Sequence, residues 1–114
     1  MGKYDLIIAN FPSESSNRNN PAGFNELVLK ALKDVKRGGW VCSLQKLTHL
    51  ESQRRHSQIY GLYKPERIYV YSHRIGWVNE KGVESKGTGM YVWCVWHKGE
   101  DGKFGNETKL DWIV

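Results

Sequence analysis

The sequence predicts an α/β fold in which three parallel strands are joined by helices and an antiparallel strand completes a C-terminal hairpin. Two observations indicate this class. Apolar runs of strand length alternate with segments of helical spacing, and no helical pattern separates the third strand from the fourth. The length of 114 residues fits one small domain, which we expect to span residues 1–114.

The first strand is expected over residues 4–9. Leu6 to Ala9 are consecutive apolar residues, a pattern typical of a central parallel strand that is covered on both faces. The polar tract that follows predicts a flexible loop over residues 13–23.

The first helix is expected from Phe24 to Lys36, because apolar residues recur there three and four positions apart. The pair Gly38-Gly39 predicts its end. The apolar run that follows, residues 40–44, is expected to be the second strand.

A second helix is expected over residues 51–63, followed by a third strand over residues 67–71. The connection over residues 73–89 has no helical pattern, so the strand at residues 90–96 should return antiparallel to the third strand. A short final strand is expected at residues 110–113.

Composition narrows the possible partners and cofactors. The formal net charge of +5 favours a negatively charged partner, nucleic acid first. Cys42 and Cys94 are far apart and form no Cys-x-x-Cys pair, so we expect free thiols. The four histidines have no metal-ligand spacing, so no metal is expected. With no membrane-length apolar run or signal peptide, we expect a cytoplasmic protein without membrane contact.

Several segments together resemble S-adenosylmethionine-dependent DNA adenine-N6 methyltransferases, notably phage and prophage members. Residues 5–13 resemble the strand and catalytic loop of that family. The end of the first helix and the second strand also match. Further matches are Leu47 to Ser52 with Arg54 and Arg55, and the strands at residues 67–72 and 91–93. The resemblance implies a truncated, Rossmann-like methyltransferase half, with its helices mainly on one face of the sheet, in a bacterial host cell.

The catalytic loop of that family reads Asn or Asp, Pro, Pro, then Tyr or Phe. The matching candidate catalytic residues are Asn10, Phe11, Pro12 and Ser13. Phe11 stands for the first proline, and Ser13 replaces the aromatic residue that stacks on the flipped base. The motif is therefore degenerate, and the resemblance implies no methyl transfer by this chain alone.

The family's cofactor site also needs a glycine turn after one strand and an acidic residue after the next. Both belong to a half of the fold that would precede Tyr4, and Gly87-Thr88-Gly89 precedes a strand instead of following one. We expect no cofactor for this chain alone, and S-adenosylmethionine only if a separate half completes it.

Two functions remain open. The first is a methyltransferase-derived protein that binds DNA or a host protein, such as a phage-encoded inhibitor of a nucleic-acid enzyme. The alternative is part of an active DNA adenine-N6 methyltransferase completed by a separate half. In either case the resemblance leaves one sheet face and the edge of the strand at residues 4–9 uncovered. We therefore expect a homodimer or a protein partner there.

Basic residues mark the candidate nucleic-acid contacts. One cluster lies on the second helix and the start of the third strand, and a basic and aromatic set lies in the connection over residues 73–89. The alternative for the first set is a solvated helix surface without a ligand. The alternative for the second set is a surface hairpin whose tryptophan packs locally. The candidates are Arg54, Arg55, Lys64, Arg67, His73, Arg74, Trp77, Lys81 and Lys86.

Overall fold

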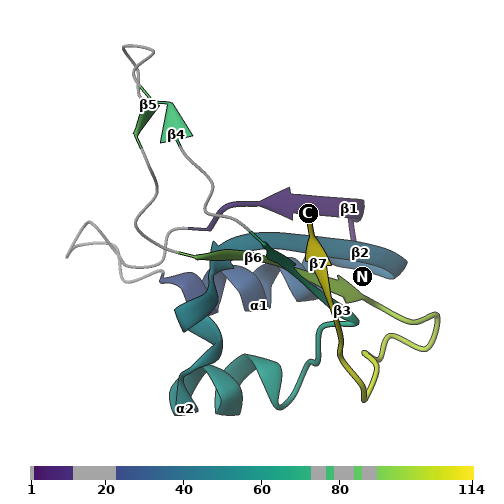
Figure 1. Cartoon of the computed structure of the whole chain (residues 1–114). Helices are drawn as coiled ribbons and strands as arrows, with labels where there is room; N and C mark the ends of the chain where they lie inside the picture. Colours follow the sequence, from purple (N-terminus) through teal and green to yellow (C-terminus); the bar gives the residue numbers. More distant parts are fainter. Residues whose placement is uncertain (1, 12–22, 73–76, 79–83, 86–89) are drawn as a thin grey trace.

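The computed structural model describes residues 2–11, 23–72, 77–78, 84–85 and 90–114. Its centre is a five-stranded mixed sheet with the order β1-β2-β6-β3-β7 (Figure 1). These strands are β1 (Tyr4–Ala9), β2 (Val35–Lys46), β6 (Tyr91–His97), β3 (Arg67–Tyr71) and β7 (Lys109–Ile113). A separate two-stranded sheet consists of β4 (Trp77–Val78) and β5 (Glu84–Ser85).

The strand directions confirm most of the expected topology. β1 and β2 pair in parallel, and β6 is antiparallel to both β2 and β3. The three strands β1, β2 and β3 therefore run in the same direction, and the antiparallel hairpin is present. Two details differ from a simple parallel series. β6 lies between β2 and β3, and β7 pairs in parallel with the outer side of β3.

The predicted helix end at Gly38-Gly39 is wrong. α1 (Phe24–Asp34) ends before the glycines, and β2 starts directly at Val35. The pairing steps from Tyr4 with Val35 to Leu6 with Trp40, so β2 carries extra residues there. Gly38 has a φ of 80°, a conformation that glycine adopts without a side-chain clash. The glycines therefore form an irregularity inside a longer β2 rather than a helix stop.

The second helical segment is shorter than the expected residues 51–63. It consists of three short turns: η1 (Leu47–Leu50), α2 (Gln53–Arg55) and η2 (His56–Tyr60), the last with π-helical geometry. Ser52 caps α2, since its Oγ accepts a hydrogen bond from the Arg55 amide at 3.2 Å. The wide turn closes where the Gly61 amide donates to the His56 carbonyl at 2.7 Å.

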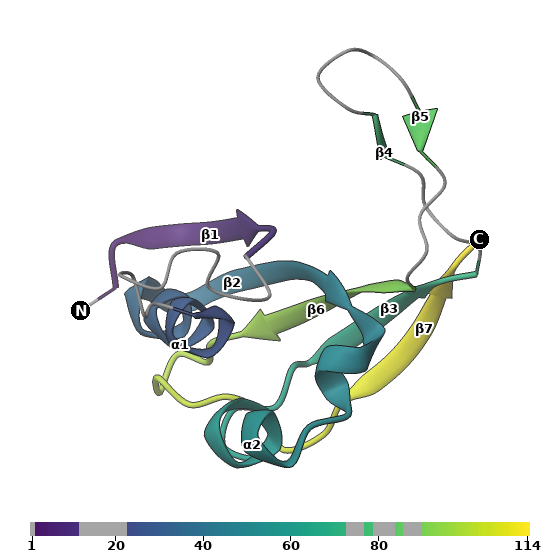
Figure 2. The same cartoon turned by 90° about the vertical axis from the view of Figure 1, so that its left-hand side faces the viewer.

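Both helical segments lie on one face of the sheet, as expected (Figures 1 and 2). We call the other side the open face, because no helix among the described residues covers it. Burial in β6 follows this division: Val92, Cys94 and Trp96 are buried toward the helices, and the residues between them are half-exposed. The helix side is therefore the hydrophobic core of the domain.

The core is fixed by aromatic and polar contacts as well as by aliphatic packing. Trp96 is fully buried, and its Nε1 donates a hydrogen bond to the Tyr63 carbonyl at 2.8 Å. Buried Gln45 donates from Nε2 to the Tyr60 hydroxyl at 2.6 Å and accepts from Ser43 Oγ at 3.3 Å. These bonds satisfy polar groups that would otherwise be costly to bury, and they hold β2 and β6 against η2.

The cysteine prediction is confirmed, because Cys42 and Cys94 are free thiols. In the described ranges, no group of three or more histidine, cysteine or acidic side chains is placed to hold a metal ion. No helix in those ranges has the length and apolar character needed to cross a membrane.

Replacing Trp96 by phenylalanine should lower the free energy of unfolding by about 2 kcal/mol, because it leaves a cavity and an unpaired Tyr63 carbonyl. Urea denaturation measures this change. The control is Trp112→Phe on β7, where the side chain is 60% exposed and the loss should stay within about 0.5 kcal/mol. Equal losses in the two variants would contradict the described core.

Candidate functional site

The first candidate site is the carboxyl end of β1. Asn10 is exposed there, whereas Phe11 is half-buried. The Phe11 ring meets Phe24, the first residue of α1, edge to face, with 6.4 Å between the ring centroids. Phe11 therefore packs partly on the core. The other two candidate catalytic residues, Pro12 and Ser13, lie outside the described residues.

Behind Phe11 lies a ring cluster centred on Phe24. His49 packs against one side of this ring with 4.6 Å between centroids, and the Arg55 guanidinium carbon lies 5.5 Å from its centroid. Within the described part of the chain, neither His49 Nδ1 nor Arg55 Nε has a hydrogen-bond partner. The cluster thus joins the end of β1, the start of α1 and the segment after β2.

His49 is kept uncharged by its surroundings. Its side chain is buried, and burial, together with the positive charges of Arg55 and Lys46, lowers its pKa from 6.5 to about 4. In the sequence, His49 was weighed only as one of four histidines without metal-ligand spacing, so its place in this cluster was not predicted. One signal was available: His49 closely follows β2, whose carboxyl end meets the same sheet edge as Asn10.

β4 and β5 lie beyond the end of the sheet toward which β1 points (Figures 1 and 2). Of the candidate nucleic-acid residues in this connection, Trp77 belongs to β4. His73, Arg74, Lys81 and Lys86 lie outside the described residues. The DNA contacts of this connection stay a prediction.

The remaining basic candidates border different hollows. Arg54 and Arg55 border a shallow hollow beside Gly23, at the start of α1. Arg67 begins β3 and borders another hollow. Lys64 is exposed and lines neither of the two. These candidates therefore do not line one common hollow.

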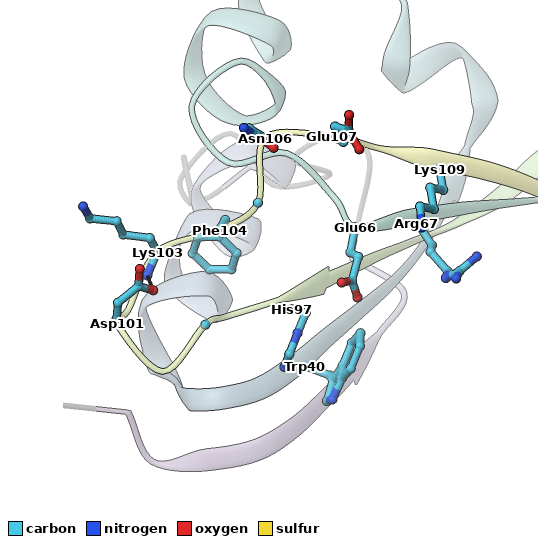
Figure 3. Close-up of a pocket in the computed structure, with 12 residues that line it drawn as sticks. Trp40, Glu66, Arg67, His97, Asp101, Lys103, Phe104, Asn106, Glu107 and Lys109 are labelled. Atoms are coloured by element: carbon cyan, nitrogen blue, oxygen red, sulfur yellow. Dashed lines mark hydrogen bonds between the residues drawn. The ribbon is translucent and has the colours of Figure 1, made fainter.

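The hollow beside Arg67 has a volume of about 630 Å³ (Figure 3). It lies at the opposite end of the sheet from Asn10, because Arg67 begins β3 whereas Asn10 follows the end of β1, which runs in the same direction. Trp40 and His97 stack at its base, with 4.0 Å between ring centroids and 11° between ring planes. Side chains of both charges line it, including Glu66 and Lys109. The lining of this hollow therefore does not favour a ligand of either charge, and we assign no catalytic group of side chains to it.

An exposed apolar surface follows β1. Tyr4, Leu6 and Ile8 alternate along the strand, so they share one face, and 52%, 53% and 63% of their surfaces are exposed. Trp40 pairs with Leu6 and extends this strip on the open face. Among the described residues, β1 has no strand on its outer side. The prediction of a central strand covered on both faces is therefore wrong, because β1 is an edge strand.

Comparison with solved structures shows a likeness of fold. A solved structure from Listeria monocytogenes, provisionally assigned as a class I S-adenosylmethionine-dependent methyltransferase, superimposes with a TM-score of 0.69 at 14% sequence identity. The match covers 99% of this chain and 38% of that protein. No protein-family model and no curated protein matches the sequence.

At this identity the likeness shows the fold alone. The chain has a methyltransferase-like α/β fold, which confirms that part of the resemblance seen in the sequence. The chain spans well under half the length of the protein that it matches. Cofactor dependence is a description of the Listeria protein, and the DNA adenine-N6 and phage assignments of this chain stay predictions.

The lowered pKa of His49 predicts a pH-dependent stability. Because the folded pKa of about 4 lies below the usual 6.5, the unfolded chain binds the proton more readily. The stabilising contribution is complete above pH 6.5 and is lost as the pH falls toward 4, on the order of 3 kcal/mol. Urea titrations across this range should show a smaller loss for His49→Phe than for the original chain.

His56→Phe is the matched control, since His56 is exposed on η2. It should keep the full loss of stability on acidification. If His49→Phe and His56→Phe have the same pH dependence, the burial of an uncharged His49 is contradicted.

Proposed function

We propose that this chain is a methyltransferase-derived half-domain that does not transfer methyl groups alone and acts by binding a partner protein. The observation that carries the proposal is the position of β1. This strand holds the candidate catalytic residues at its carboxyl end, yet it is an edge strand with exposed apolar side chains.

The position of β1 bears directly on the cofactor. In open α/β sheets the ligand lies in a crevice at the carboxyl ends of the strands, where two halves of the sheet meet. β1 has a neighbour on one side only among the described residues, so they supply one wall of such a crevice. This supports the absence of S-adenosylmethionine binding by the chain alone.

The loop chemistry supports the same conclusion. Stacking and edge hydrogen bonds must offset the few kcal/mol needed to extrude a base. Asn10 is exposed and could offer its amide, but Phe11 is packed against Phe24. Ser13 has no aromatic ring. The loop therefore retains hydrogen-bonding capacity and lacks a stacking surface.

A protein fits the exposed surface better than DNA. Binding to the DNA backbone depends on basic side chains that track phosphates, and the described candidates Arg54 and Arg67 line different hollows. The strip along β1 is apolar instead, and an apolar strip at an open strand edge favours a polypeptide. The proposed partner is therefore a protein.

The second candidate is one half of a DNA adenine-N6 methyltransferase that a separate half completes. The exposed amide of Asn10 at the carboxyl end of β1 favours it, because the family uses this residue to hold the target amino group. Under this reading the partner would supply the cofactor pocket as well as cover β1.

Isothermal titration of the isolated chain with S-adenosylmethionine tests the proposal. We expect no saturable heat, while an intact methyltransferase of the same fold binds in the same buffer. One-to-one binding by the chain alone would contradict the proposal and favour the enzyme. In a parallel arm, fluorescence anisotropy should detect no salt-sensitive binding to duplex DNA; such binding would make DNA the partner.

A further inference from the structure

β1 has the sequence of an interior strand in the position of an edge strand. Leu6 and Ile8 point to the open face and Ile7 and Ala9 to the helix side, so both faces are apolar. Strands of this kind are normally paired on both sides, and an exposed one is a template for another strand.

The opposite edge of the sheet is built differently. In β7 the charged residues Lys109 and Asp111 alternate with apolar ones. Charges on an edge strand disfavour pairing with another chain. Of the two edges, β1 is therefore the one that calls for a partner strand.

We propose that β1 pairs antiparallel with β1 of a second copy of this chain, about a twofold axis perpendicular to the sheet. The inference rests on the proposed function, because it names the partner of the same surface. An axis at Leu6 places Leu6 opposite its own counterpart and Tyr4 opposite Ile8, all on the open face. Aromatic residues opposite β-branched ones are favourable cross-strand pairs.

The resulting strip is continuous. Each copy contributes Tyr4, Leu6 and Ile8, and Trp40 flanks Leu6 on the neighbouring strand. A twofold axis places Tyr4, Leu6 and Ile8 of one copy beside those of the other across the paired strands. The two five-stranded sheets become one sheet of ten strands, and the outer backbone groups of β1 gain hydrogen bonds.

The helix side of the edge also complements itself. A shallow groove there lies between β1 and α1, and its α1 wall carries Leu27, Lys30, Ala31 and Asp34. Lys30 Nζ and Asp34 Oδ2 are 3.0 Å apart within one copy. Because the axis reverses the direction of α1, it can bring Lys30 of one copy near Asp34 of the other. A basic residue and an acidic residue one turn apart thus match their own image.

One charge lies within β1 itself. Asp5 is on the helix side of the strand, and its carboxylate is 3.8 Å from Lys36 Nζ in the same copy. In the proposed register Asp5 lies opposite Ile7, so it meets no second carboxylate across the strand. Its ion pair with Lys36 stays available at the surface.

Sedimentation or light scattering at increasing concentration tests the inference. We expect a monomer–dimer equilibrium for the original chain. Leu6→Lys should weaken the dimer about tenfold, because it places two like charges directly opposite each other across the strands and removes the apolar pair. The matched control is Leu110→Lys on β7, where the leucine is 50% exposed, and its dimer should be unchanged.

Cysteine cross-linking tests the register while it keeps an uncharged side chain at the axis. In a Cys42→Ser background, Leu6→Cys should form a disulfide between copies on mild oxidation, since directly opposite residues have Cα atoms about 4.5–5.5 Å apart. Leu110→Cys is the control and should not cross-link within the dimer. The cross-linking experiment with Leu6→Cys also tests the inference if the Leu6→Lys variant does not fold.

A monomer at all concentrations would overturn the inference. A dimer lost in Leu110→Lys and kept in Leu6→Lys would place the contact on β7 and would also overturn it. Neither result depends on cofactor binding, so the S-adenosylmethionine titration separately decides the proposed function.

Discussion

In the described part of the chain the outer edge of β1 is unpaired, and the rest of the structure depends on this constraint. A strand that is apolar on both faces is less stabilised when its side chains and edge backbone groups remain in water, by roughly 25 cal/mol per Å² of exposed apolar surface. In this chain the helix side of β1 is partly covered by α1, while Leu6 and Ile8 remain more than half exposed on the open face. The exposed apolar surface of these side chains therefore contributes no hydrophobic stabilisation within one copy of the chain.

The same strand connects the edge to the candidate catalytic loop. β1 ends at Ala9, and Phe11 inserts toward Phe24, which also contacts His49 and Arg55. This packing holds Phe11, the second of the candidate catalytic residues, partly against the core.

The two faces of the sheet also differ in how complete they are. The helix side has buried tryptophan, valine and cysteine side chains and a satisfied hydrogen-bond chain through Gln45 and Tyr60. The open face has exposed Tyr4 and Trp40 instead. Among the described residues, the helix side of the sheet is therefore packed, whereas the open face exposes apolar side chains of β1 and β2.

Sequence patterns predicted the helices and strands better than they predicted which strands pair. The apolar run at β1 and the helical spacing of α1 are local signals, and both elements start where expected. The position of β6 between β2 and β3 depends on pairing between distant segments, which no local pattern encodes. Gly38 was misread for a similar reason, because a glycine with positive φ suits a helix end and an irregular strand equally well. His49 gained its role only from tertiary contacts with Phe24 and Arg55.

Amide hydrogen exchange along β1 tests the central claim most directly. Alternate amides of β1 should be protected by β2 at every concentration. The intervening amides, which point away from β2, should exchange rapidly in dilute protein and become protected as the protein is concentrated. Slow exchange of all β1 amides in the dilute protein, or rapid exchange of the outward amides at every concentration, would contradict the account.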